Sequence, residues 1–245
     1  MSIPLSTTFK VSVSDEVAVT AKMDAPANAA KGDPILLLAH GANNDLDFPL
    51  LAYLGLHLAH LAAVSTVRFN FPYVERGSTS PDARPVLERT FTKVYEHVVR
   101  HIAGPGAPLF IGGKSLGGRA AAELVSRNAE NSGLAAAGLI VLGYPLHRPG
   151  HKEQLFLDPL RHVDVPSLFC IGSRDTLCDP ALLAPVLEGL VVPGALYVVQ
   201  GGDHSLHLPQ SGGRRPDDSY APVTQTIAAF IQRTLSKAPA AAVSD

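Results

Sequence analysis

A serine flanked by glycines, at the junction of an apolar run and a helical pattern, constrains the fold of this chain most strongly. Gly113, Ser115 and Gly117 form Gly-x-Ser-x-Gly directly after the apolar residues 109–111, and a segment of helical character follows. This order predicts a strand, a sharp turn at Ser115 and a helix. The two glycines are needed because a Cβ at either position would collide with a neighbouring strand or helix. Such a turn pushes the serine hydroxyl outwards, where it can act as a nucleophile.

Short apolar runs alternate with helical patterns along most of the chain. The runs are typical of strands buried on both faces and cover residues 35–39, 64–69, 109–111, 139–142, 167–171 and 196–199. Helical patterns cover residues 50–61, 86–103, 117–128, 180–190 and 223–235. Residues 9–13 and 17–21 alternate apolar and polar around a turn, which predicts an antiparallel hairpin at one edge. The sequence therefore predicts an α/β fold, with a mostly parallel sheet of eight strands and helices on both faces.

Length and composition restrict the class of protein. The 245 residues predict a single domain over residues 1–245, in which the Ala-, Pro- and Ser-rich residues 237–245 form a frayed tail. A net charge of −2 gives no reason to expect nucleic acid or a membrane surface as a partner. No apolar run reaches the roughly 18–20 residues of a membrane span, and residues 1–5 lack the features of a signal peptide. We therefore expect a cytoplasmic protein.

A serine hydroxyl is a weak nucleophile at neutral pH, so the motif needs a histidine base and a carboxylate that orients the histidine. In proteins with such a turn, the acid follows the serine in the sequence and the histidine follows the acid, each in a loop after a later strand. Asp175 follows the apolar run 167–171, and His204 follows the run 196–199. The sequence predicts a catalytic triad of Ser115, Asp175 and His204. The alternatives are His207 as the base and Asp179 or Asp203 as the acid.

Acyl transfer at a serine also needs two main-chain N–H groups directed at the developing negative charge. One is predicted at Leu116, at the amino end of a helix, where the helix dipole also favours an anion. The second is predicted in the loop after residues 35–39, where the sequence reads His-Gly-Ala-Asn-Asn from His40. In that loop, either Ala42 or Asn43 is the donor.

Other interpretations of the polar motifs are weaker. Gly-Lys-Ser at 113–115 resembles the end of a phosphate-binding loop, but Pro108 stands where that loop needs a glycine. His97 and His101 lie one helical turn apart, as two metal ligands would, but no third ligand accompanies them. We therefore expect no metal and no cofactor. The two cysteines of the chain do not form a disulfide framework.

Six ordered motifs resemble one branch of the α/β hydrolases. They lie at residues 38–42, 69–73, 112–119, 143–147, 172–175 and 202–206. Together they look like the testis-expressed-protein-like branch, whose domain type also occurs in a subunit of a histone acetyltransferase complex. This branch is similar at longer range to dienelactone hydrolases. The resemblance implies an α/β-hydrolase fold and the same triad but no substrate, and the cysteine of dienelactone hydrolases is replaced here by Ser115.

Only residues 143–166 separate two predicted strands at the point where larger α/β hydrolases carry a lid. This length allows a turn and one short helix, so we expect no large lid and a shallow, open site. Tyr144 and His147 begin this segment and, with His40, are candidates to contact the substrate. Tyr144 and His147 are equally consistent with structural roles in a tight Tyr-Pro turn.

The sequence thus predicts a serine hydrolase that cleaves a carboxylic ester or thioester of a small molecule through an acyl-enzyme, as a monomer or homodimer. The alternative is a non-catalytic module that keeps the fold for protein interaction, as in the chromatin-complex relative. An intact triad favours the enzyme.

Overall fold

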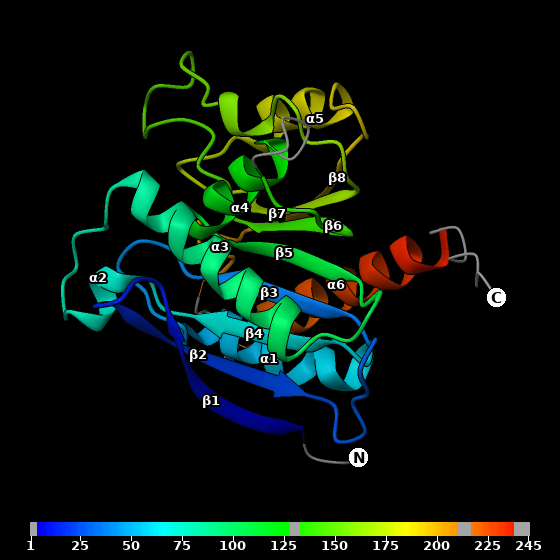
Figure 1. Ribbon diagram of the computed structural model, residues 1–245. Helices are drawn as coiled ribbons and strands as arrows, with labels where there is room; N and C mark the ends of the chain where they lie inside the picture. The colour runs from blue at the N-terminus through cyan, green and yellow to red at the C-terminus, as the bar shows by residue number, and fades with distance from the viewer. Residues whose placement is uncertain (1–3, 128–132, 210–216, 238–245) are drawn as a thin grey trace.

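The computed structural model describes residues 4–127, 133–209 and 217–237, and within them eight strands form one sheet. The order of the strands across the sheet is β1-β2-β4-β3-β5-β6-β7-β8 (Figure 1). The strands are β1 (Leu5–Ser12), β2 (Ala18–Ala25), β3 (Ile35–Ala39), β4 (Ser65–Phe69), β5 (Leu109–Lys114), β6 (Gly138–Leu142), β7 (Ser167–Gly172) and β8 (Ala195–Val199). All eight predicted strands are confirmed.

The sheet is mixed in the way the sequence predicts. β1 pairs antiparallel with β2, and β2 pairs antiparallel with β4, so the hairpin occupies one edge. From β4 to β8 every neighbouring pair is parallel. Because β3 to β7 are buried along their whole length, they carry the continuous apolar runs from which they were predicted.

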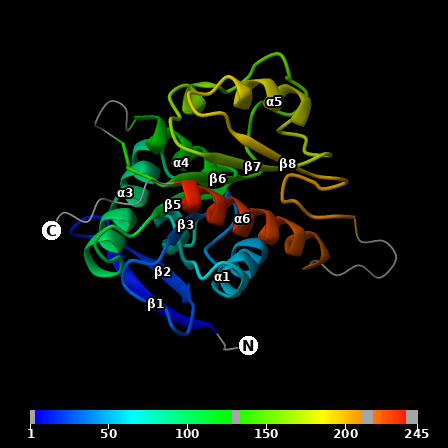
Figure 2. The ribbon, with the colours of Figure 1, turned by 90° about the vertical axis from the view of Figure 1, so that its right-hand side faces the viewer.

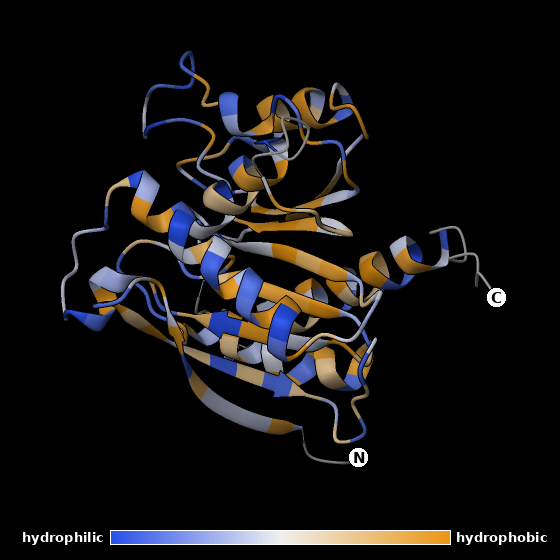
Figure 3. Cartoon of the chain, in the orientation of Figure 1, coloured by the Kyte–Doolittle hydropathy of each residue, from blue (hydrophilic) through white to orange (hydrophobic). Residues whose placement is uncertain are grey.

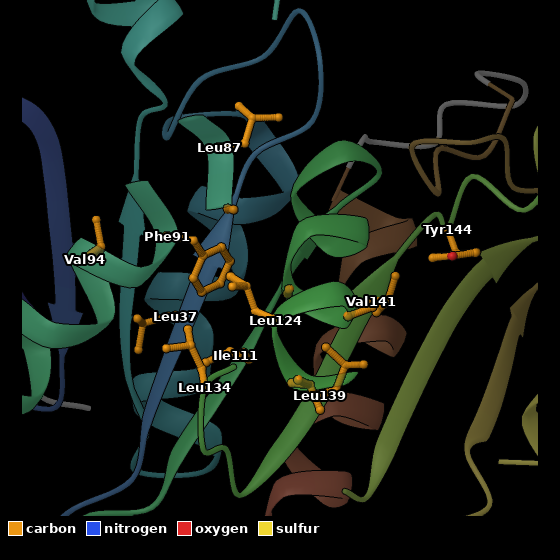
Figure 4. Packing of buried hydrophobic residues seen from close by; sticks show 14 of the residues in the cluster. Leu37, Leu87, Phe91, Val94, Ile111, Leu124, Leu134, Leu139, Val141 and Tyr144 are labelled. Atoms are coloured by element: carbon orange, nitrogen blue, oxygen red, sulfur yellow. The ribbon is translucent and has the colours of Figure 1, made fainter. Parts of the chain in front are cut away.

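Helices cover both faces of the sheet (Figures 1 and 2). One face carries α1 (Pro49–Leu61) and α6 (Asp217–Lys237), and the other carries α3 (Arg84–His101), α4 (Leu116–Ser126) and α5 (Pro180–Glu188). The strands at the centre of the sheet are apolar, whereas the helices place their hydrophilic residues on the outside (Figure 3). On the α3–α4 face, Phe91, Leu124 and Val141 belong to one apolar cluster (Figure 4). The parallel sheet is therefore shielded from water on both sides.

Two helices differ from the prediction. The short α2 (Pro72–Glu75) was not predicted, because four residues are too few to give a helical pattern in the sequence. α6 begins at Asp217, six residues before the predicted start at Val223, and runs through Pro222. A proline near the start of a helix removes few hydrogen bonds, and the buried Tyr220 and Val223 on either side of it still pack against the sheet.

The segment between β6 and β7 is short and carries no large lid. Among the described residues from 143 to 166, one short 3₁₀ helix occurs, η2 (Asp158–Leu160). The predicted tail lies outside the described residues except for Lys237, which ends α6. None of the helices in the described ranges is both long and apolar enough to cross a membrane.

Candidate active site

The turn at Ser115 joins β5 directly to α4. Ser115 has φ 49° and ψ −111°, a conformation that costs an L-residue about 1–2 kcal/mol. Two main-chain hydrogen bonds hold it, from the N–H of Ser115 to the carbonyl of Leu142 and from the N–H of Arg119 to the carbonyl of Ser115, both 2.9 Å. The turn therefore has the strained geometry that the sequence predicts.

The glycines on either side of Ser115 allow β3 to approach the turn. A Cβ on Gly113 would lie 2.4 Å from the carbonyl oxygen of Ala39, and a Cβ on Gly117 would lie 2.5 Å from the same atom. Real Cβ atoms do not approach a main-chain oxygen so closely. Both glycines are thus required by packing, as the motif indicates.

Ser115, His204 and Asp175 are hydrogen-bonded in series. The Oγ of Ser115 lies 2.9 Å from Nε2 of His204, and Nδ1 of His204 lies 2.8 and 2.9 Å from the two carboxylate oxygens of Asp175. Since a carboxylate only accepts hydrogen bonds, Nδ1 carries the proton and Nε2 is left as the acceptor for the serine hydroxyl. The structure brings together the three residues that the sequence proposes as a triad.

The loops that carry the acid and the histidine are bonded to each other. The N–H of Arg174 donates to the carbonyl of Gly202 over 2.8 Å. A Cβ on Gly172 would lie 2.3 Å from the carbonyl oxygens of Gly202 and Asp203, so only glycine permits this approach. The side chain of Asp175 is fully buried and also accepts the N–H of Leu177 over 2.8 Å. These contacts fix the carboxylate against His204.

The alternative acids and the alternative base lie outside this series. Asp203 shapes the histidine loop, because its Oδ1 accepts the N–H groups of Ser205 and His207 over 2.8 and 2.9 Å. The ring of His207 bonds through Nε2 to the hydroxyl of Tyr220 over 2.5 Å. Asp179 caps α5 at the N–H of Ala181 and pairs with Lys152 over 2.6 Å, which lowers the pKa of Asp179.

The predicted oxyanion donors lie next to Ser115. Leu116 is the first residue of α4, where main-chain N–H groups have no partner inside the helix. The loop after β3 touches the serine, because a Cβ on Gly41 would lie 3.4 Å from Cβ of Ser115. Within the described residues, the N–H groups of Leu116, Ala42 and Asn43 have no hydrogen-bond acceptor. Either Ala42 or Asn43 therefore remains a candidate for the second donor.

His40 braces the same loop from inside the protein. Its side chain is fully buried, its Nδ1–H donates to the carbonyl of Gly41 over 2.8 Å, and its Nε2 accepts the N–H of Phe71 over 3.0 Å. Burial lowers the pKa of His40, and the hydrogen bond to Gly41 and the charge of Asp45 oppose this effect only in part. The ring packs edge-on against Phe71 and Tyr73. It presents no surface to a substrate.

Tyr144 and His147 are also buried. The hydroxyl of Tyr144 donates to the carbonyl of Phe156 over 2.9 Å, and burial raises its pKa. His147 is 1% exposed, and its Nδ1–H donates to the carbonyl of Arg148 over 2.9 Å. Both residues anchor the segment after β6, which agrees with the structural role weighed for them above.

His97 and His101 lie side by side on α3, with ring centroids 4.6 Å apart. His97 stacks on Phe9 of β1 at 5.3 Å. In the part of the chain that the structure describes, no group of three or more His, Cys, Asp or Glu side chains is arranged to hold a metal ion.

Two cavities were not foreseen from the sequence: one is lined by Leu116, the residue after Ser115, and the other lies at the loop after β3. The first, the α3–α4 pocket, has a volume of about 220 Å³. One side is formed by Asp82, just before α3, and by Arg84 and Leu87 of α3, and the other by the face of α4 with Leu116, Arg119, Ala120 and Glu123. The second, the β3–α1 cavity, has a volume of about 450 Å³ and includes Asn43, Asp45, Asp47, Phe48 and Tyr73. The spacing 116, 119, 120 and 123 places these residues on one helical face, but the sequence does not show that α3 leaves a gap there.

Comparison with known proteins identifies the family. Residues 32–232 match the family described as an alpha/beta hydrolase domain, and the chain belongs to this family.

Solved structures with the same fold include a dienelactone hydrolase from Anabaena variabilis, with a TM-score of 0.71 and 18% identity over 95% of this chain and 99% of that one. Est1E from Butyrivibrio proteoclasticus has a TM-score of 0.72 and 14% identity, over 94% and 99% of the two chains. An α/β serine hydrolase without a lid from Xanthomonas campestris has a TM-score of 0.65 and 17% identity, over 96% and 97%. The predicted likeness to dienelactone hydrolases is thus confirmed for the fold.

Proposed function

We propose that this protein is a serine hydrolase that cleaves a carboxylic ester or thioester of a small molecule through an acyl-enzyme. The observation that carries the proposal is the hydrogen-bonded series from Ser115 through His204 to Asp175. Ser115 has a positive φ at a sharp turn, which directs its hydroxyl away from the main chain. His204 lies within hydrogen-bond distance of both the nucleophile Ser115 and the orienting acid Asp175, as this chemistry requires.

In the first half of the reaction, Oγ of Ser115 attacks the substrate carbonyl carbon while Nε2 of His204 takes the hydroxyl proton. The negative charge on the carbonyl oxygen is stabilised by the N–H of Leu116 and by that of Ala42 or Asn43. Asp175 stabilises the imidazolium through the Nδ1–H bond. The imidazolium then gives its proton to the leaving alcohol or thiol as the bond to the carbonyl carbon breaks.

In the second half, water hydrolyses the acyl-enzyme. Nε2 of His204 takes a proton from the attacking water, and the oxygen adds to the acyl carbon to give a second oxyanion. The ester bond to Ser115 then breaks, the proton returns to its Oγ, and the carboxylic acid leaves. All the groups that act in these steps are side chains and main-chain N–H groups of the site, together with water.

A fluorophosphonate probe tests this proposal directly, because it labels only an activated serine. We expect labelling of the folded wild-type protein and no labelling of Ser115→Ala. Hydrolysis of p-nitrophenyl acetate and butyrate should show the same dependence on Ser115. A folded wild-type protein that is neither labelled nor active would contradict the proposal and favour the non-catalytic interaction module.

A further inference from the structure

The α3–α4 pocket begins at the residue that follows the nucleophile. Leu116 supplies a proposed oxyanion N–H from its main chain, and its side chain lines the pocket. A substrate carbonyl whose oxygen reaches that N–H has its carbon at Ser115. One of the two groups attached to that carbon is thereby directed towards the pocket.

One part of the wall of this pocket suits an apolar chain. Leu87 from α3, and Leu116 and Ala120 from α4, provide its apolar lining. Leu87 and Ala120 are each 4% exposed, so both belong to well-packed helices with little freedom to move apart. At about 30 Å³ for each water-sized group, the 220 Å³ volume accommodates roughly seven such groups. The pocket therefore has room for a short chain only.

An ion-pair network forms the polar part of the pocket wall. Glu123 is 3% exposed, and its two oxygens accept hydrogen bonds from Nε of Arg119 over 3.2 Å and pair with Nε of Arg84 over 2.7 Å. The guanidinium of Arg119 also lies 5.4 Å from the ring centroid of Phe156. Because the side chain of Arg84 is 57% exposed, this part of the wall borders solvent, and an apolar chain that extends beyond Leu87 and Ala120 meets charged groups and water instead of an apolar surface.

The β3–α1 cavity has different properties. Its volume of about 450 Å³ is twice as large, and its two carboxylates, Asp45 and Asp47, are exposed. The side chains of Asp82 and Glu123, the carboxylates of the α3–α4 pocket, are only 10% and 4% exposed. The side chain of Asp47 is 59% exposed, so water reaches this cavity. Because Asn43 lines it, this cavity also adjoins the proposed oxyanion donors. It suits the polar half of a substrate better than an apolar chain.

We propose that the α3–α4 pocket binds the acyl chain and restricts the substrates to esters of short acyl groups, with about four to seven carbons. The alcohol or thiol part of the substrate lies in the β3–α1 cavity and is polar. This inference rests on the proposed hydrolase function, since it assigns the two halves of the substrate to two sides of the same site.

Filling the pocket tests the assignment. Ala120→Leu adds three carbons to the pocket wall, and Ala228→Leu makes the same change at a residue of similar burial, 6% exposed, on α6 at the opposite face of the sheet. The measurement is kcat/KM for p-nitrophenyl acetate, butyrate, hexanoate and octanoate. For the wild type we expect a maximum at butyrate or hexanoate and a decrease of about tenfold or more at octanoate. Ala120→Leu should lower the hexanoate-to-acetate ratio by about tenfold, whereas Ala228→Leu should not change it.

A second variant covers the possibility that Ala120→Leu does not fold. Leu87→Ala enlarges the pocket and should raise the octanoate-to-acetate ratio by about fivefold or more. A folded Ala120→Leu or Leu87→Ala protein with the wild-type chain-length profile would overturn the inference while leaving the hydrolase function intact. Absence of Ser115-dependent hydrolysis of every ester would instead overturn the proposed function.

Discussion

Two histidines lie in loops at the same edge of the sheet, and their surroundings differ. His40 follows β3 and is fully buried, with both ring nitrogens bonded to main-chain groups. His204 lies in the loop after β8, is 21% exposed, and bonds a carboxylate with one nitrogen and a serine hydroxyl with the other. Both lie close to the turn at Ser115.

The difference lies in the partner of Nδ1 and in access to water. A main-chain carbonyl fixes the tautomer of His40 but offers no charge to stabilise an imidazolium, whereas Asp175 offers that charge to His204. Only His204 is also reached from outside. The hydrogen-bond partner of Nδ1 and the exposure of the ring thus decide whether a histidine after a strand stabilises a loop or transfers a proton.

Replacement of the proposed base should give the largest effect. His204→Ala removes the acceptor of the serine proton, so kcat should fall by about 10⁴–10⁶-fold with little loss of stability. The control is His207→Gln, three residues further on, which should lower kcat by less than about tenfold. Steady-state hydrolysis of p-nitrophenyl butyrate measures both, and similar losses in the two variants would contradict the assignment of the base.

The carboxylate behind His204 should matter almost as much. Asp175→Asn keeps the shape of the side chain but replaces one hydrogen-bond-accepting oxygen with an NH₂ group, which donates. The imidazole of His204 is then held in the wrong tautomer, so kcat should fall by about 10³–10⁴-fold. The matched variant Asp179→Asn changes a helix cap and should leave kcat within a few fold. Equal activity of Asp175→Asn and the wild type would mean that the acid has no role.

Replacement of His40 should instead lower the stability of the fold. His40→Ala leaves a cavity and a buried N–H on Phe71 without an acceptor, so the free energy of unfolding should fall by about 2–4 kcal/mol. His60→Ala on the exposed side of α1 should cost less than about 0.5 kcal/mol. Urea denaturation of both proteins measures the difference. A His40→Ala protein as stable as the wild type would show that the bracing is unimportant.

The lowered pKa of His40 gives a further, smaller effect. Below pH 6.5 the unfolded chain protonates His40 while the folded protein still resists protonation, so the unfolded state binds more protons and stability falls as the pH is lowered. The difference in the free energy of unfolding between wild type and His40→Ala should therefore be constant above pH 7 and shrink as the pH is lowered below 6.5. Urea denaturation at several pH values tests this, and a gap that stays constant or widens below pH 6.5 would contradict it.

The smallest effect is expected from the backbone strain at Ser115, in the turn close to both histidines. Ser115→Gly and Ser115→Ala both lack the hydroxyl, but only glycine adopts φ 49° without strain. The glycine variant should be more stable than the alanine variant by about 1 kcal/mol. Thermal denaturation of the pair measures this, and equal stability would mean that the turn stores no strain.

The sheet and the hydrogen-bonded series could be predicted because local pattern dictates them. β3 to β7 are buried on both faces and so appear as continuous apolar runs, and chain order alone linked Ser115 to Asp175 and His204. The burial of His40 could not be predicted in this way. It depends on Phe71 and Tyr73, which follow β4 and reach the ring only after the strands have assembled.

The α3–α4 pocket escaped prediction for a related reason. Its walls come from two helices whose separation depends on how Leu87 and Glu123 pack, and no local pattern records that distance. Similarly, α6 starts before Pro222 because contacts of Tyr220 with the sheet outweigh the proline signal in the sequence.

The strain at Ser115 has a practical consequence for protein engineering. A library selected for heat resistance alone would be drawn towards glycine at position 115, because glycine relaxes the turn, and that change deletes the proposed nucleophile. Melting temperature would improve while turnover vanished. A screen of this protein for thermostable variants therefore has to score hydrolysis in every round, or hold position 115 fixed.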